Sequence, residues 1–273
     1  MSFPKLPISR TDCSAAIVME TQPRFQLPSI DDEERPSDWY LYSSLAMLYE
    51  AKLFRLTGLR DLSKETIELY WGMRNLTGLK EVSIHLKQRV EFLSYSDMVE
   101  RLERRVITLV QSKVSKSPKQ NGSIFVLFGN AALFHVYMFM RDLPRGLPFS
   151  NLLATHLRTS IEAADLESLH NEYPEMMLWI LMMGGLGSSS TTNRRWYAEL
   201  LVQACMTSEL RGGNAIAIAL ADFLWSELYR SPVTIGFWND VAKAQGMDGG
   251  YEERKVADHI SVAAFNSRPI IVD

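Results

Sequence analysis

Cysteine is scarce in this sequence: its 273 residues contain only Cys13 and Cys205. Two thiols form at most one disulfide, and they are too few for the cysteine-rich ligand sets of structural zinc sites. The scarcity excludes a disulfide-rich secreted scaffold and predicts a reduced, intracellular protein. Cys205 falls on the apolar side of a predicted helix, so we expect it to be inert packing rather than a reactive thiol.

An excess of positive charge is also lacking. The chain has 29 Lys and Arg against 32 Asp and Glu, a formal net charge of -3. Nucleic-acid-binding domains are usually basic, so this balance does not favour DNA as a partner. Glu100 and Glu103 interrupt the one basic stretch, which predicts a solvated helix face rather than a phosphate-binding surface. The basic stretch consists of Arg101, Arg104, Arg105, Lys113, Lys116 and Lys119.

No hydrophobic run is long enough to cross a bilayer as a helix. The longest apolar stretch, residues 124–140, falls short of the roughly 20 residues required and contains Asn130 and His135. A buried core helix explains it at lower cost, because each polar group then needs only one protein partner. The N-terminus carries no apolar run of the kind found in secretory signals. We therefore expect no membrane association, and we expect His135 to be a hydrogen-bonded core histidine rather than a ligand.

The common catalytic motifs are missing as well. The five histidines form no H-x-x-x-H or H-E-x-x-H pair, and no G-x-S-x-G elbow occurs. The glycines of the G-G-L-G segment, Gly184, Gly185 and Gly187, follow a predicted helix, whereas a phosphate-cradling loop follows a strand. The sequence thus predicts no catalytic, cofactor-binding, metal-binding or DNA-binding residue, no cofactor, and a protein that is not an enzyme.

An acidic run is the one feature that favours an enzyme. Asp31, Asp32, Glu33 and Glu34 could bind Mg²⁺, as carboxylates do in helical, metal-dependent terpenoid enzymes. The run lies beside Pro36 in a predicted loop, and no second carboxylate cluster faces it. A solvated acidic segment is the simpler interpretation. A terpenoid-type enzyme stays as one alternative, and a small-molecule binding protein as another.

What the sequence does contain is helical periodicity almost throughout. Residues 176–183 are apolar at every position, as in a helix buried on all sides. Pro174 suits the first helical position, and Gly184 and Gly185 are predicted to end the helix in the left-handed conformation. Trp179 is expected at the centre of the core.

We predict an all-α fold with a single multi-helix domain over residues 37–245. Residues 1–36 contain scattered prolines and are predicted to be an extended or disordered arm. Residues 246–273 are predicted to pack on the same domain. The expected helices span residues 38–56, 63–75, 81–116 (as one or two helices), 124–140, 152–164, 174–183, 193–205, 214–229 and 235–244.

The apolar helix and its neighbours also resemble a known family. The pattern P-x-x-x-L-W-I-L-x-x-G-G starts at Pro174, and a small-residue loop and Arg195, Trp196 and Tyr197 follow. This order resembles the fungal-specific transcription factor regulatory domain, the helical domain C-terminal to the Zn2Cys6 binuclear cluster. Residues 128–148, and the tryptophan-containing segments 223–225 and 236–238, are similar to other parts of the family. The likeness covers residues 39–244.

The resemblance implies a role in transcription regulation without direct DNA recognition. The family reads DNA with a six-cysteine zinc cluster, and the N-terminal segment here has only Cys13. The chain resembles the regulatory half alone, as a fragment, a truncated product or a stand-alone relative. The implied partners are other proteins, either transcription factors or a second copy of the chain, with a small-molecule effector left open. The implied location is the nucleus; without the resemblance we expect the cytoplasm. The family signature residues, with a structural role expected for each, are Pro174, Trp179, Gly184, Gly185, Arg195 and Trp196.

Overall fold

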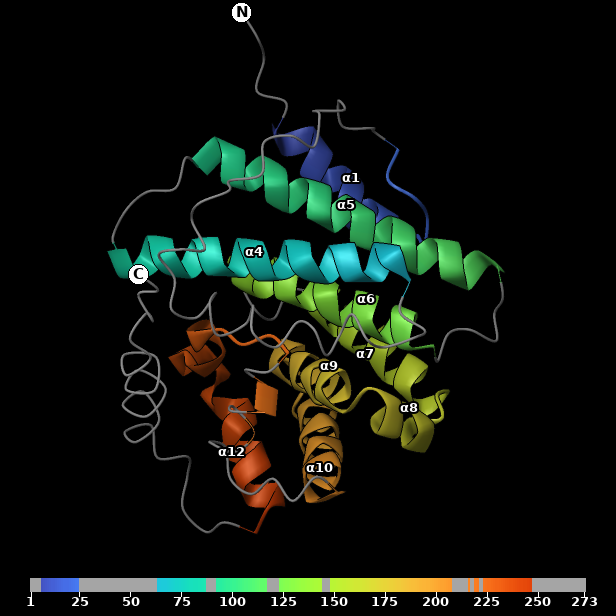
Figure 1. Cartoon of the computed structure of the whole chain (residues 1–273), viewed down its shortest axis with the longest axis vertical. Coiled ribbons are helices and arrows are strands. Elements are labelled where there is room, and N and C mark those ends of the chain that lie inside the picture. The colour runs from blue at the N-terminus through green and yellow to red at the C-terminus, as the bar shows by residue number, and fades with distance from the viewer. Residues whose placement is uncertain are drawn as a thin grey trace, which may run out of the picture.

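All the regular elements of the computed structural model are helical within the residues it describes, namely 6–24, 63–86, 92–116, 123–143, 148–207, 216, 219–220 and 223–246. The predicted all-α fold is confirmed. The longer helices are α1 (Leu6–Val18), α4 (Lys64–Leu86), α5 (Phe92–Lys116), α6 (Ile124–His135), α7 (Pro148–Glu162), α8 (Leu166–Glu172), α9 (Pro174–Gly187), α10 (Thr191–Thr207) and α12 (Ile235–Ala244) (Figure 1). Short helical turns are η3 (Val136–Met140), η4 (Glu227–Arg230) and η5 (Pro232–Thr234).

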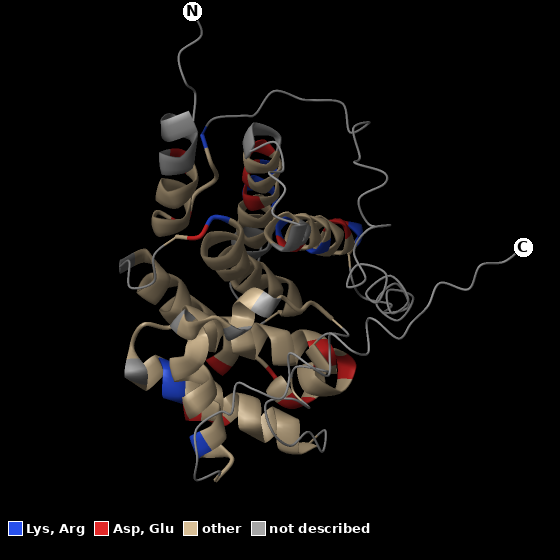
Figure 2. Cartoon of the chain, turned by 90° about the vertical axis from the view of Figure 1, so that its left-hand side faces the viewer, with Lys and Arg blue, Asp and Glu red and all other residues tan. Residues whose placement is uncertain are grey.

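Two helical segments that are buried on every side form the centre of the molecule. Every residue of α6 and η3 from Val126 to Met140 is buried, and so is α9 from Met176 to Gly187. Such helices have no side to offer to water, so they pack against each other and are covered by the rest. The middle of the molecule consequently carries almost no charged side chains, whereas α4 and α5 carry both signs (Figure 2). Among the described residues, no helix is long and apolar enough to span a bilayer.

The surrounding helices are amphipathic and turn one side toward this centre. On α5, Val99, Leu102 and Val106 recur at spacings of three and four residues and are buried. This side of α5 packs on α6, and α4 packs on both α5 and η3. On the opposite side of the centre, α10 packs on α9, and α12 packs on α10 (Figure 1).

The helix that starts as α6 ends in a π-helical turn. The backbone N–H of Arg141 donates to the carbonyl of Val136 at 2.9 Å, a bond between residues five apart. Lys80 from α4 donates to the carbonyls of Phe139 and Met140, which end this turn, and its ammonium lies 2.7 Å from the Asp142 carboxylate. Such turns are rare and often occur where a helix must present particular side chains.

The N-terminal segment differs from its prediction. Residues 1–36 were expected to be an extended or disordered arm, yet Leu6–Val18 form α1, which packs on α5. The inner face of α1 contains Asp12 beside Cys13, Ala16 and Ile17, all buried. A charged residue on the inner face conceals the apolar stripe by which an amphipathic helix is recognised, which is why the periodicity did not predict α1.

Several helix ends were also predicted wrongly. α4 continues through Gly78, which was expected to be a turn, and ends at Leu86. The helix predicted over residues 214–229 does not extend to its expected end, since Ser226 is in an extended conformation and caps the short η4 turn. The acidic run 31–34, the predicted helix 38–56 and the tail beyond residue 246 lie outside the described residues.

Candidate functional site

The predicted signature residues lie on α9 and α10 but do not all meet. Pro174 is the first residue of α9, and the side chain of Trp179 is completely buried, as predicted for the core. Trp196 packs edge-on against Tyr197, with ring centroids 4.9 Å apart, and the guanidinium of Arg158 lies 4.7 Å from the centroid of Trp196.

Arg195, by contrast, is exposed. Its neighbour Arg194 makes the interhelical contact instead: the Nε of Arg194 donates to the Asp240 carboxylate of α12 at 2.5 Å. The arginine of this segment that ties α10 to α12 is therefore the one that the sequence did not single out.

Gly184 and Gly185 do not end the helix, which corrects their predicted role. Both lie inside α9, which continues to Gly187, and Gly246 is the only glycine of the described residues with a positive φ. A Cβ atom on Gly184 would lie 2.3 Å from the ring of Tyr197, and one on Gly185 would lie 2.0 Å from the ring of Phe237. These glycines let two aromatic rings, from α10 and α12, approach the α9 backbone closely.

His135 stands at the centre of a chain of buried hydrogen bonds. Its Nε2 lies 2.7 Å from the Thr77 hydroxyl, and its Nδ1 lies 2.8 Å from the Tyr229 hydroxyl. Thr77 donates its only hydroxyl proton to the carbonyl of Met73 at 2.7 Å, and Trp179 Nε1 donates to Tyr229 at 3.4 Å. The prediction of a hydrogen-bonded core histidine is confirmed, with two side-chain partners.

This chain of bonds determines which nitrogen of His135 carries the proton. Since the Thr77 proton is used on Met73, Thr77 must accept from His135, so Nε2 is protonated. Nδ1 then accepts from Tyr229, whose oxygen in turn accepts from Trp179. Every donor has an acceptor only while the imidazole is neutral. Complete burial, helped by the nearby charge of Lys80, lowers the pKa of His135 to about 3.

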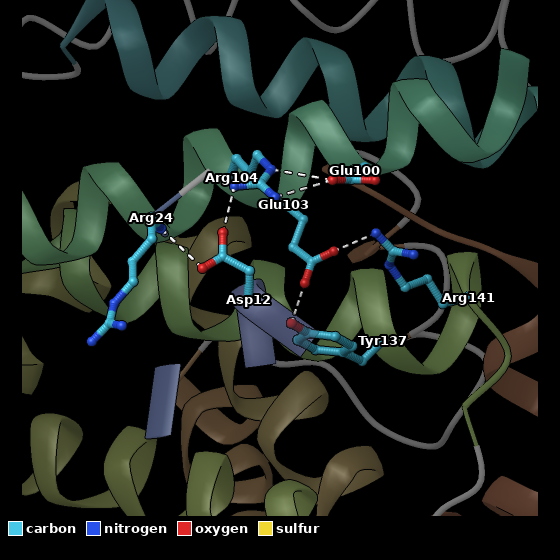
Figure 3. Close-up of polar contacts among 7 residues, drawn as sticks. All are labelled: Asp12, Arg24, Glu100, Glu103, Arg104, Tyr137 and Arg141. Atoms are coloured by element: carbon cyan, nitrogen blue, oxygen red, sulfur yellow. Dashed lines mark hydrogen bonds and ion pairs between the residues drawn. The ribbon is translucent and has the colours of Figure 1, made fainter. Parts of the chain in front are cut away.

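A second polar cluster joins α1, α5 and the end of η3. The Arg104 guanidinium donates to the Asp12 carboxylate at 3.0 Å and to the Glu100 carboxylate at 3.2 Å (Figure 3). The other oxygen of Asp12 accepts from the backbone N–H of Arg24 at 2.9 Å. The exposed fractions of the Asp12, Glu100 and Arg104 side chains are 6%, 5% and 10%. Arg104 was predicted to lie on a solvated face, and that prediction is wrong.

Glu103 forms the inner half of this cluster. One oxygen of its carboxylate accepts from the Tyr137 hydroxyl and the other from the Arg141 guanidinium (Figure 3). Burial raises the pKa of Glu103, and the Arg141 charge and the Tyr137 hydrogen bond oppose the rise. The π-helical turn spans the residues between Tyr137 and Arg141, so both side chains reach the same carboxylate on α5.

The sequence contained a signal for this cluster that the charge pattern concealed. Glu103 comes four residues after Val99 and three before Val106, which places it on the buried side of α5. An acid at such a position needs a partner. Tyr137 lies within the long apolar run 124–140 and Arg141 directly follows it, and few other polar groups occur there. Spacing alone therefore indicated a buried carboxylate, whereas the alternation of signs indicated a solvated face.

Both thiols are buried, and neither is activated as a nucleophile. Burial raises the pKa of Cys205 to about 12, and burial together with the negative charge of Glu103 raises that of Cys13 to about 12. A thiol attacks or binds metal as the thiolate, so neither is activated in this state. Within the described ranges, no three His, Cys, Asp or Glu side chains converge in a way that would hold a metal ion.

Both polar clusters connect helices. The His135 chain joins α4, α6, α9 and η4, and the Arg104–Glu103 cluster joins α1, α5 and η3. In comparisons with known proteins, the chain matches no protein family, no curated protein and no solved structure.

Proposed function

We propose that this chain is a non-catalytic regulatory domain that acts through contacts with other proteins. It would be a domain of the fungal transcription-factor type without the zinc cluster, located in the nucleus. In this role it modulates transcription through a partner, either a transcription factor or a second copy of itself. Sequence-specific contact with DNA would be left to that partner, and a small-molecule effector remains compatible with the role.

One observation carries the proposal: among the described residues, His135, Glu103 and both cysteines are engaged inside the fold. His135 is a neutral link between two hydroxyl groups, Glu103 holds Tyr137 and Arg141, and both thiols have pKa values raised to about 12. A general base or nucleophile must reach a substrate with a pKa near the working pH. Because these side chains make contacts within the fold, they support a non-catalytic domain that functions through contacts made by its surface.

The resemblance supplies the class of partner. Pro174 and Trp179 lie on α9, and Gly184 and Gly185 admit the rings of Tyr197 and Phe237, so the motif coincides with the packing of α9, α10 and α12. A motif that specifies packing is what a helical scaffold needs, and this agreement is compatible with the regulatory-domain proposal.

The experiment that tests the proposal is affinity purification of the full chain, tagged at its native locus, with the co-purifying proteins identified by mass spectrometry. We expect zinc-cluster factors or other nuclear regulators. The Trp179→Ala chain, which is expected to lose its fixed packing, is the control: proteins that it captures as well as the wild-type chain does are discounted, because their capture does not require the folded domain. Recovery of the wild-type chain alone, from the cytosol, would contradict the proposal.

A further inference from the structure

We draw no further inference here: the strongest candidate, the π-helical turn η3 with the buried charges of Glu103 and Arg141 beside it, belongs to the polar cluster already described, whose side chains bind one another inside the fold.

Discussion

At the scale of single residues, the notable feature is a histidine that the fold keeps neutral. The partners of His135 are a hydroxyl that must accept and a hydroxyl that must donate. Complete burial and the nearby charge of Lys80 oppose a second proton on the ring, which is why the pKa of His135 falls to about 3. In the unfolded chain the same imidazole titrates near its ordinary value of 6.5.

The lowered pKa of His135 predicts acid sensitivity. Between pH 6.5 and 3 the unfolded state binds one more proton than the folded state, so stability falls as pH falls, by about 1.4 kcal/mol per pH unit. We expect a loss of about 2 kcal/mol at pH 5 relative to pH 7 from this residue. Urea unfolding at a series of pH values measures it. His135→Gln should flatten the dependence, and His156→Gln, which removes a partly exposed imidazole, should leave it in place; equal slopes in all three chains would contradict the assignment.

Glu103 and Arg141 form a buried ion pair. Replacing one of the two should reduce the free energy of unfolding more than replacing both. Glu103→Gln keeps an acceptor for Tyr137 but leaves the Arg141 guanidinium buried without a carboxylate, which should cost about 3–5 kcal/mol. Arg141→Met should cost a similar amount for the opposite reason. The double variant should recover most of the loss, because no buried charge is left unpaired. Unfolding free energies of all four chains test this, and additive losses would show that the two side chains are not coupled.

At the scale of elements, the packing of α10 and α12 around α9 depends on two glycines of α9, Gly184 and Gly185, which have no side chain. The ring of Tyr197 lies against Gly184 and is held there by its hydroxyl, which donates to the carbonyl of Ala154 at 2.9 Å. Phe237 lies against Gly185 from α12. Glycine at these two positions lets the two rings approach the α9 backbone more closely than a Cβ atom would allow.

Gly185→Ala is therefore expected to destabilise the protein. Alanine favours a helix by about 1 kcal/mol over glycine, but a methyl group forced against a buried ring costs about 1–3 kcal/mol, so we expect a net loss of up to about 2 kcal/mol. The control is Gly236→Ala on α12, where the nearest atom to a new Cβ is Arg194 Nη1 at 3.4 Å. Thermal unfolding should show a lower midpoint for the first variant and an equal or higher one for the second. A rise for Gly185→Ala would refute the close-packing interpretation.

At the scale of the whole molecule, the core is continuous and aromatic at its centre. Trp179 packs against Phe128 and Phe223, with ring centroids 5.9 and 5.4 Å apart, and its indole N–H ends the His135 chain. One side chain thus links the apolar core with the polar chain that joins α4, α6 and η4. The buried helices α6 and α9 meet at this point.

Trp179→Ala should cost the molecule most of its stability. Removing a buried tryptophan costs about 3–5 kcal/mol, a large share of the 5–15 kcal/mol that holds a typical domain together. We expect insoluble protein or protein without fixed tertiary packing, as judged by near-ultraviolet circular dichroism. Trp196→Ala, at a half-buried position on α10, should give a folded chain with a smaller loss. A Trp179 variant that melts like the wild type would refute the central role of this residue.

Local pattern by itself determined the helical fold class, the two helices buried on every side, and the burial of Trp179 and His135. These depend on which residues stand three or four positions apart, information that a single stretch of chain contains. Tertiary structure alone decided that Gly184 and Gly185 are close-packing positions rather than helix ends, because the rings that demand the space come from α10 and α12. It also decided that Arg104 is buried, since its partner Asp12 is 92 residues away. Periodicity predicts which face of a helix is buried. Whether a charged side chain can be buried on that face depends on a partner, and the fold brings that partner from a distant segment of the chain.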